Sequence, residues 1–455
     1  MRMKKLWGNT ALLSGATLLM TFVGLLFQSW LVRRIGTAGI GLYQLLGSVT
    51  ALSATLAISG IRFASTRLVA EELGAKDAPG VSSAMLRCLC YAVLTGTAAG
   101  VLLGSFARPI GEIWIGDART VDSLRLTALS MPCVSLSASL SGYFTACGRV
   151  WKPTGVRLFD QLSGIALSVL LLRSATPGDV EGVCIALVLG RLGADVISLL
   201  ILLVVFLDDR QRYGPAGNGA GQTRRMLIIA VPLAFSAYAR SALNTAQHLL
   251  VPRELERAGS SREAALSGYG TVHGLALPLV FFPACILSAA SELIVPDLTE
   301  RQVQQDAPAI RRSVHMFLRF SGFFSLAVSA FLFFCAEPIG MLFYHSGEAG
   351  SAIRLLAPLV PIAYLDISVD GCLKGLGEQL WCMGVNVADS LLGLLLLRLL
   401  LPRYALTGYV FVLYATELFN FVLSAGRLAF RLSSLPAFSR RLCGAAGRCA
   451  YTAGT

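Results

Sequence analysis

Residues 84–111 read AMLRCLCYAVLTGTAAGVLLGSFARPIG, an apolar run that ends in the motif Ala107-Arg108-Pro109-Ile110-Gly111. A helix needs roughly 20 predominantly apolar residues to cross about 30 Å of hydrocarbon, so this run is long enough to span a membrane. The closing motif returns at residues 336–340, which read AEPIG. An apolar span attached to a motif that recurs far along the chain predicts a membrane protein built from two copies of one unit.

The composition of the whole chain agrees with that prediction. Of 455 residues, 55% are hydrophobic and 14% are charged, and the mean hydropathy is +0.68. The sequence therefore predicts an all-α polytopic membrane protein with about twelve transmembrane helices. The expected spans are residues 8–32, 41–68, 84–107, 121–147, 155–175, 181–207, 226–250, 267–296, 315–337, 351–376, 380–402 and 405–431.

Further matches follow the repeated motif at a nearly constant offset. The matched pairs are Tyr43 with Tyr269, Ala64-Ser65 with Ala290-Ser291, Pro132 with Pro358, and Gly182 with Gly408. Each copy holds an even number of spans, so the copies are expected to be parallel six-helix repeats related by an axis along the membrane normal. The expected domains are a first bundle over 1–207, a linker over 208–225, a second bundle over 226–431 and a tail over 432–455.

The basic residues indicate the orientation of the chain. The net charge is +12, but the Lys and Arg residues are scattered between apolar runs and form no basic arm, so nucleic acid is not an expected partner. About twice as many of them fall in the loops on the side of the N-terminus as in the opposite loops. Both termini of this multi-pass protein are therefore expected on the cytoplasmic side of the cell membrane.

Several stretches resemble one family of membrane proteins. They are Arg33–Gln44, Leu250–Arg253, Ser267–Gly270, Tyr364–Asp366, Asp370–Gly377, Gly408–Val410 and Glu417–Asn420. Together they resemble stage V sporulation protein B-like proteins of the polysaccharide transporter family. That family is part of the multidrug/oligosaccharidyl-lipid/polysaccharide exporter superfamily, which includes the lipid II flippases.

The resemblance implies both a fold and a function. It implies two six-helix bundles that form a V around a central cavity. It also implies a flippase that moves an undecaprenyl-linked saccharide, for peptidoglycan or another envelope polysaccharide, from the cytoplasmic to the outer leaflet. The expected partners are this lipid-linked saccharide, the membrane lipids and a coupling ion, H⁺ or Na⁺; no cofactor and no metal are expected.

An anionic headgroup calls for cations inside the membrane-spanning region. An intramembrane Arg costs about 2.5–3.5 kcal/mol on insertion scales and normally faces a cavity or a partner. Arg240 lies mid-span with Asn244 and Gln247 on the same helical face, and it is the first candidate for contacting the lipid diphosphate. Arg62, near the cytoplasmic end of its span, is the second. A salt bridge to a neighbouring helix is the competing interpretation of each arginine.

Acidic residues inside the spans suggest a second kind of site. Asp366, Asp370 and Lys374 stand four residues apart and share one helix face. This ladder fits two interpretations: a site for a coupling proton or Na⁺, or a structural network closed by Lys374. Glu292 is a more isolated candidate for the same role, while His273 and His345 give no signal of a site.

Three other functions remain open from the sequence. An ion-coupled multidrug exporter of the same superfamily commonly carries an acid in its first span, and residues 8–32 contain no Asp or Glu. A membrane glycosyltransferase or polymerase would usually need a sizeable external loop, and the expected external loops are short. A scaffold protein with a degenerate cavity is the third. No Walker lysine follows Gly36, Gly39 and Gly41, so ATP hydrolysis is not expected.

Overall fold

The computed structural model describes residues 2–75, 77–173, 180–211, 213 and 221–434. We call residues 2–211 the first half and residues 221–434 the second half. The middle of the expected linker and most of the expected tail lie outside the described residues. Within them, the protein is an all-α polytopic membrane protein, with nine helical stretches long and apolar enough to cross a membrane.

Two of these nine stretches each contain two helical arms. Helix α1 (Arg2–Ile58) has 57 residues and would measure about 86 Å if straight, far more than the bilayer core. It bends at Gly36, whose φ of 70° lies in the left-handed region that glycine tolerates. The sequence predicted a turn between two spans here; the chain instead changes direction at a single residue. Helix α16 (Gln379–Ser434) bends in the same way at Ala405.

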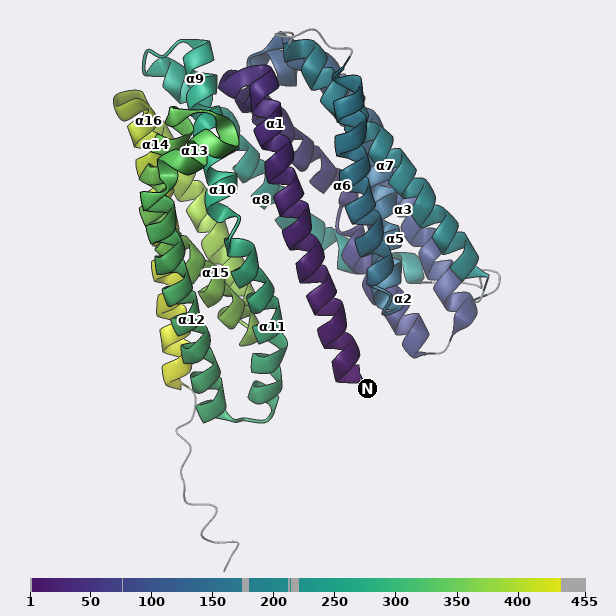
Figure 1. Ribbon diagram of the computed structural model, residues 1–455. Helices are drawn as coiled ribbons and strands as arrows, with labels where there is room; N and C mark the ends of the chain where they lie inside the picture. The colour runs from purple at the N-terminus through teal and green to yellow at the C-terminus, as the bar shows by residue number, and fades with distance from the viewer. Residues whose placement is uncertain (1, 76, 174–179, 212, 214–220, 435–455) are drawn as a thin grey trace, which may run out of the picture.

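The remaining helices of the first half lie together on one side of α1 (Figure 1). They are α2 (Ile61–Gly74), α3 (Ala78–Ser105), α5 (Val121–Ala146), α6 (Trp151–Leu171) and α7 (Val180–Arg210), with short turns α4 (Ala107–Pro109), η1 (Ile110–Ile115) and η2 (Ala118–Thr120). The expected span 41–68 is interrupted between α1 and α2, because Ser59 and Gly60 both have positive φ.

The second half follows a similar order. Its elements are α8 (Gln222–Arg257), α9 (Arg262–Tyr269), the π-helix η3 (Gly270–Ala276), α10 (Leu277–Phe281), α11 (Ala284–Val303), α12 (Ala307–Phe334), α13 (Ala336–Tyr344), α14 (Gly347–Leu356), η4 (Ala357–Leu359), α15 (Val360–Gly375) and α16. Figure 1 shows α2–α7 and α9–α16 as two groups with α1 between them, diverging toward the end where the N-terminus lies.

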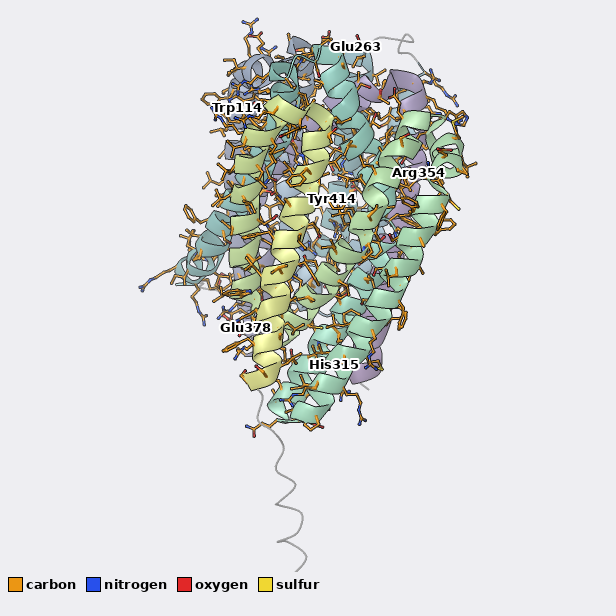
Figure 2. All side chains as sticks on the ribbon, turned by 90° about the vertical axis from the view of Figure 1, so that its left-hand side faces the viewer. Trp114, Glu263, His315, Arg354, Glu378 and Tyr414 are labelled. Carbon is orange, nitrogen blue, oxygen red and sulfur yellow. The ribbon has the colours of Figure 1, made fainter. Side chains whose placement is uncertain are left out.

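Residues from loops that are expected on opposite sides of the membrane lie at opposite ends of the molecule. In Figure 2, Trp114 and Glu263 lie at one end, and His315 and Glu378 lie at the other. We call the first the α9 end and the second the N-terminal end.

The two halves repeat the same local structures at a fixed offset. Asp77 caps α3 by accepting a hydrogen bond from the Gly80 amide at 3.1 Å, and Asp306 caps α12 by accepting one from the Ala309 amide at 3.0 Å. Each cap is followed by Ala-Pro, and the two caps are 229 residues apart. The caps thus extend the repeat seen in the Ala107 and Ala336 motifs.

A buried helix contact also recurs. Ser65 on α2 donates to the carbonyl of Ser139 on α5 at 3.1 Å, and Ser291 on α11 donates to the carbonyl of Ile367 on α15 at 3.3 Å. At both places a glycine lets the helices approach: a Cβ on Gly371 would lie 2.7 Å from the Ser291 Cβ, and one on Gly142 would overlap Ser65. Corresponding helices of the two halves therefore pack through corresponding residues.

Helix α8 belongs to both groups of helices. At its start, Gln222 donates to Glu72 of α2 at 3.2 Å, and Arg87 of α3 donates to Thr223 at 2.6 Å. Further along, Gln247 donates to the carbonyl of Ser390 on α16 at 2.8 Å. The helix therefore begins against the first half and continues into the second, and its middle lies between them.

Candidate functional site

The middle of α8 lines a polar cavity of about 460 Å³. Arg240 faces it from α8 and Asp389 faces it from α16; the other lining residues are Thr55, Ala237, Ser241, Asn244, Asn386 and Ser390. We call it the Arg240 cavity. Arg240 is exposed and makes no ion pair with any residue that the structure describes. Its guanidinium is therefore available to an anion.

The two neighbours predicted with Arg240 have different roles. Asn244 lines the cavity, and its Oδ1 accepts a hydrogen bond from Ser390 at 3.4 Å. Gln247, one turn further, lies in the packing between α8 and α16, where its amide donates to the Ser390 carbonyl and fills the space over Gly393. It helps to position the cavity wall.

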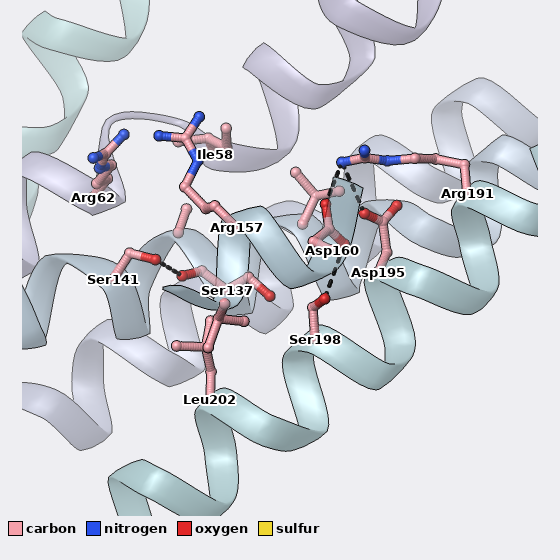
Figure 3. A pocket seen from close by; sticks show the side chains of 13 residues that line it. Ile58, Arg62, Ser137, Ser141, Arg157, Asp160, Arg191, Asp195, Ser198 and Leu202 are labelled. Atoms are coloured by element: carbon pink, nitrogen blue, oxygen red, sulfur yellow. Dashed lines mark hydrogen bonds and ion pairs between the residues drawn. The ribbon is translucent and has the colours of Figure 1, made fainter. Parts of the chain in front are cut away.

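Arg62 lies in a second pocket, of about 200 Å³, inside the first half (Figure 3). We call it the Arg62 pocket. It contains three arginines and two carboxylates, together with serines of α5 and α7. Its polar lining residues are Arg62, Ser137, Ser141, Arg157, Asp160, Arg191, Asp195 and Ser198.

One arginine of this pocket is neutralised. The Arg191 Nη2 lies 2.9 Å from Asp160 Oδ2 and 3.2 Å from Asp195 Oδ1, and Ser198 donates to Asp160 at 3.0 Å. Arg191 and Asp195 are four residues apart on one face of α7, and Asp160 joins them from α6. Both carboxylates of the pocket are thus engaged by Arg191.

The other two arginines lack an acidic partner. Arg62 and Arg157 are exposed, and neither forms an ion pair within the described ranges. Their charges interact with one another, and Figure 3 shows their guanidinium groups together on one side of the pocket, apart from the Arg191 cluster. Two adjacent, unneutralised guanidinium groups form an arrangement that suits a phosphate or diphosphate.

The two pockets open on the same turn of α1. Thr55 lines the Arg240 cavity and Ile58 lines the Arg62 pocket, three residues further along that helix. Beside them, the Tyr238 hydroxyl of α8 is hydrogen-bonded to Ser59 at the break between α1 and α2. The end of α1 therefore separates two sites that each carry unpaired positive charge.

The two aspartates of the predicted acidic ladder have different surroundings: Asp370 is paired with Lys374, and Asp366 is buried. The Lys374 Nζ lies 3.3 Å from Asp370 Oδ2. Asp366 is only 8% exposed, and its Oδ1 has no hydrogen-bond partner among the described residues. Asp366 also interacts electrostatically with Asp389 and Glu417, so the second half contains a cluster of four acids with one lysine. Glu292, on α11, is exposed and forms no ion pair in the described part of the chain.

A polar network links this cluster to the Arg240 cavity. The single hydroxyl hydrogen of Ser424 can be donated to Asp370 Oδ1, at 3.5 Å, or to Asn420 Oδ1, at 3.4 Å, and Asn420 donates to Asn386 at 3.3 Å. Asn386 lines the cavity. A change in the charge of Asp370 can thus alter the position of Asn386 in the wall of the Arg240 cavity through these hydrogen bonds.

The sequence analysis missed several residues of these sites. Arg157 was overlooked, although its three-residue spacing from Asp160 places both on one face of α6. Asn386 gave no signal, because a single amide in an apolar span has no characteristic spacing, and Asn420 stood in the resembling stretch Glu417–Asn420 with no role attached to it.

Long apolar helices surround these charged pockets, and the fold is one that solved transporters share. The MatE family profile matches residues 13–170 and 258–398, so the chain belongs to the MatE family, a family of membrane transporters.

Individual proteins show the same relationship. The chain is 24% identical to stage V sporulation protein B of Bacillus subtilis (strain 168) over 414 residues, covering 89% of this chain and 77% of that protein. It is 20% identical to sporulation protein YkvU of the same strain, covering 76% and 77%. An inward-facing multidrug resistance MATE family transporter has the same fold, with a TM-score of 0.73, 14% identity and coverage of 91% and 95%.

Proposed function

We propose that this transporter moves a lipid-linked saccharide, an undecaprenyl-diphosphate sugar, from the cytoplasmic to the outer leaflet by alternating access. The observation that carries this proposal is a set of three arginines that face pockets and have no acidic partner among the residues that the structure describes: Arg62, Arg157 and Arg240. An Arg inside a membrane-spanning region normally faces a cavity or a partner, so arginines that face pockets without an acidic partner in the described residues support an anionic substrate.

The architecture fits such a cycle. We propose twelve transmembrane helices: each arm of α1 and α16 spans once, α2 continues the second arm of α1, and α9–α11 and α14–α15 each form one span. The helices divide into parallel repeats over 1–207 and 226–431, joined by the linker 208–225 and followed by the tail 432–455. Both termini are cytoplasmic, so the N-terminal end is the end at which the central cavity would admit substrate.

The division of charge suggests how a headgroup is held. Arg240, in the cavity between the halves, contacts the diphosphate when the substrate enters, and Asn244 donates to the sugar or the phosphate. Arg62 and Arg157, across the end of α1, provide a second position for the same charge. Rocking of the halves then changes which pocket is open to which leaflet.

Binding of a purified lipid tests this proposal. The protein in nanodiscs is titrated with an undecaprenyl-diphosphate saccharide, and Arg240→Ala is compared with wild type and with Arg108→Ala, whose arginine pairs with Glu112 away from the pockets. Loss of a charge-assisted diphosphate contact costs about 1.5–3 kcal/mol, which is about 10–150-fold in affinity. Arg240→Lys retains the charge and loses the bidentate geometry, so it should bind with intermediate affinity.

Unchanged affinity of Arg240→Ala at equal thermal stability would contradict the proposed role of Arg240. If Arg62→Ala and Arg157→Ala also bind as wild type does, the lipid diphosphate is not the ligand of these pockets.

An ion-coupled multidrug exporter is the second candidate function. The observation in its favour is Asp389, a carboxylate that lines the same cavity as Arg240 and would suit a cationic drug. The two functions predict opposite ligands. A lipophilic cation such as ethidium should bind in an Asp389-dependent way only if the protein is a multidrug exporter.

A further inference from the structure

A cavity of about 740 Å³ lies within the second half, between α9, η3, α14 and the second arm of α16. We call it the Thr271 cavity. It shares no lining residue with the Arg240 cavity or the Arg62 pocket. Small-molecule sites typically measure about 300–1,000 Å³, so the Thr271 cavity has room for a ligand. In Figure 2, Glu263 marks α9, Arg354 marks α14 and Tyr414 marks the second arm of α16, which surround it.

Thr271 supplies a buried hydroxyl that has no hydrogen-bond partner among the described residues. The residue is only 5% exposed and lies in the π-helix η3. A threonine in an α-helix can satisfy its hydroxyl with the carbonyl four residues earlier, as Thr50 and Thr127 do at 2.9 and 2.8 Å. Thr271 makes no such bond, so its hydroxyl can donate to, or accept from, a ligand in the cavity.

The other polar side chains of the lining carry hydroxyl groups and one carboxylate. They are Ser267 of α9, Glu348 and Ser351 of α14, and Thr407 of α16. Ser351 donates to the carbonyl of Gly347 at 3.1 Å, so its oxygen remains as an acceptor. Glu348 is exposed and forms no ion pair within the described ranges. The cavity therefore offers both donors and acceptors to a ligand that is rich in hydroxyl groups.

The rest of the lining is apolar and contains no positive charge. No Lys, Arg or His is among the described residues that line the cavity, so it does not suit a phosphate. Val272, Leu355 and Leu406 line it beside the polar groups, and Tyr414 joins two of its walls by donating to the Leu355 carbonyl at 2.8 Å. A sugar ring has the same division, with hydroxyl groups at its edge and C–H groups on its faces.

We propose that the Thr271 cavity binds a saccharide. Thr271, Ser351 and the other hydroxyls of the lining exchange hydrogen bonds with the sugar hydroxyls, and the Glu348 carboxylate accepts from two neighbouring ones. The cavity lies at the α9 end, which is the external end in the proposed topology. The inference that it holds the headgroup of a translocated lipid rests on the proposed function; a glycan of the cell envelope has the same chemistry and is the other source.

Binding of soluble glycosides tests the site without a lipid. Methyl glycosides of glucose, galactose and N-acetylglucosamine are titrated into the protein in nanodiscs, and magnetisation transfer from protein to sugar is measured by nuclear magnetic resonance. Thr271→Val retains the shape of the side chain and loses one neutral hydrogen bond, so it should weaken binding about 2–10-fold. Thr127→Val, at a buried threonine of α5, is the matched control and should bind as wild type does. No binding of any glycoside to wild type, or equal binding to Thr271→Val, would overturn the proposal.

Thermal stability separates a binding role of Thr271 from a structural one. Removing a buried hydroxyl that has no partner removes a desolvation cost, so Thr271→Val should melt at or above the wild-type temperature while it binds glycoside more weakly. A lower melting temperature of Thr271→Val would show that the hydroxyl supports the fold, and would overturn its assignment to a ligand.

Glu348→Gln provides a second variant at an exposed position. Hydrogen bonds to a charged group are stronger than neutral ones, so this variant should weaken glycoside binding about tenfold. Glu300→Gln, at an exposed acid near the end of α11, is its control. Equal glycoside binding by Glu348→Gln and Glu300→Gln would overturn the role of the carboxylate.

Two lipids identify the source of the saccharide. Wild type and Thr271→Val are compared for affinity to undecaprenyl diphosphate with and without one N-acetylglucosamine. A loss confined to the sugar-bearing lipid assigns the cavity to the translocated headgroup. Unchanged lipid affinities together with weaker glycoside binding assign it to an envelope glycan.

The outcomes separate this inference from the proposed function. Arg240→Ala should weaken binding of both lipids alike, because it removes a contact to the diphosphate that they share. A failure of that result leaves the glycoside titration intact, and a failure of glycoside binding leaves the Arg240 comparison intact.

Discussion

Gly41 of α1 and Gly270 of η3 touch backbone to backbone, one from each half of the molecule. A Cβ built on Gly270 would lie 2.8 Å from the backbone nitrogen of Gly41 and would overlap the carbonyl oxygen of Thr37. A Cβ on Gly41 would overlap the carbonyl of Leu266. Because the atoms in the way belong to the backbone, neither side can yield by changing a rotamer.

Gly41→Ala should therefore separate the halves at the α9 end. Forcing a methyl group into a packed contact costs of order 1–3 kcal/mol, so the variant should unfold at a lower temperature and should expose a cysteine at Ser267 to an impermeant maleimide. Gly47→Ala on the same helix is the control, because a Cβ there meets nothing within 4 Å. If both variants label and melt alike, the contact does not hold the halves together.

Arg157→Ala should weaken binding of an undecaprenyl-diphosphate lipid about as much as Arg62→Ala does. Neither guanidinium group has an acidic partner in the described part of the chain, and each would donate charge-assisted hydrogen bonds to phosphate. Because they lie together, the double variant should lose less than the sum of the two single losses. The measurement is lipid affinity in nanodiscs; additive losses would indicate that the two arginines act at separate places.

Replacing both aspartates of the acidic ladder, Asp366 and Asp370, distinguishes a role in ion coupling from a structural role. If the ladder couples transport to an ion, the double variant Asp366→Asn, Asp370→Asn should flip lipid at a rate that no longer depends on pH or Na⁺. If it is a structural network, the same variant should retain that dependence and lose thermal stability, because Lys374 loses its partner at 3.3 Å. Glu292→Gln, at an exposed acid of α11, is the control and should change neither quantity.

Glu378 should make the stability of the second half depend on pH below about 4.3, the ordinary pKa of Glu. A hydrogen bond from Arg427 at 2.9 Å and the charge of Arg431 lower the pKa of this carboxyl, which lies in the turn before α16. A lowered folded-state pKa stabilises the protein above the unfolded value, and that stability is lost as the pH falls through the folded-state pKa. Wild type and Glu378→Gln should thus differ in melting temperature at neutral pH and converge in acid. A parallel decline would contradict this, and Glu263→Gln, at an exposed position, is the control.

Helical periodicity predicted some of the site and not the rest. Arg240 and Asn244 are four residues apart and do line one cavity, because both face the same side of α8. Gln247 shares that periodicity, yet α16 covers it, and nothing in the sequence of α8 states where a neighbouring helix crosses. His273 gave no signal of a site in the sequence for the same reason, because its contact with His248 depends on how α8 packs against η3.

More of the fold than of the site could be predicted from the sequence, since apolar runs and repeated motifs are local properties of the sequence. Even so, Asp77-Ala78-Pro79 and Asp306-Ala307-Pro308 are identical, 229 residues apart, and stronger evidence of duplication than the pairs first recognised. The bend at Gly36 follows from a residue that tolerates positive φ. The bend at Ala405 does not, because alanine rarely adopts that conformation and only the surrounding packing imposes it.

The contact of Gly41 with Gly270 joins two spans that correspond in the repeat. Gly41 lies two residues before Tyr43 and Gly270 lies one residue after Tyr269, the repeat partner of Tyr43, so the two spans meet close to equivalent positions. In a dimer of identical subunits, the same surface of each subunit meets its copy about a two-fold axis. If the halves arose by gene duplication, this contact descends from a homodimer interface, and the ancestor was a shorter protein that worked in pairs.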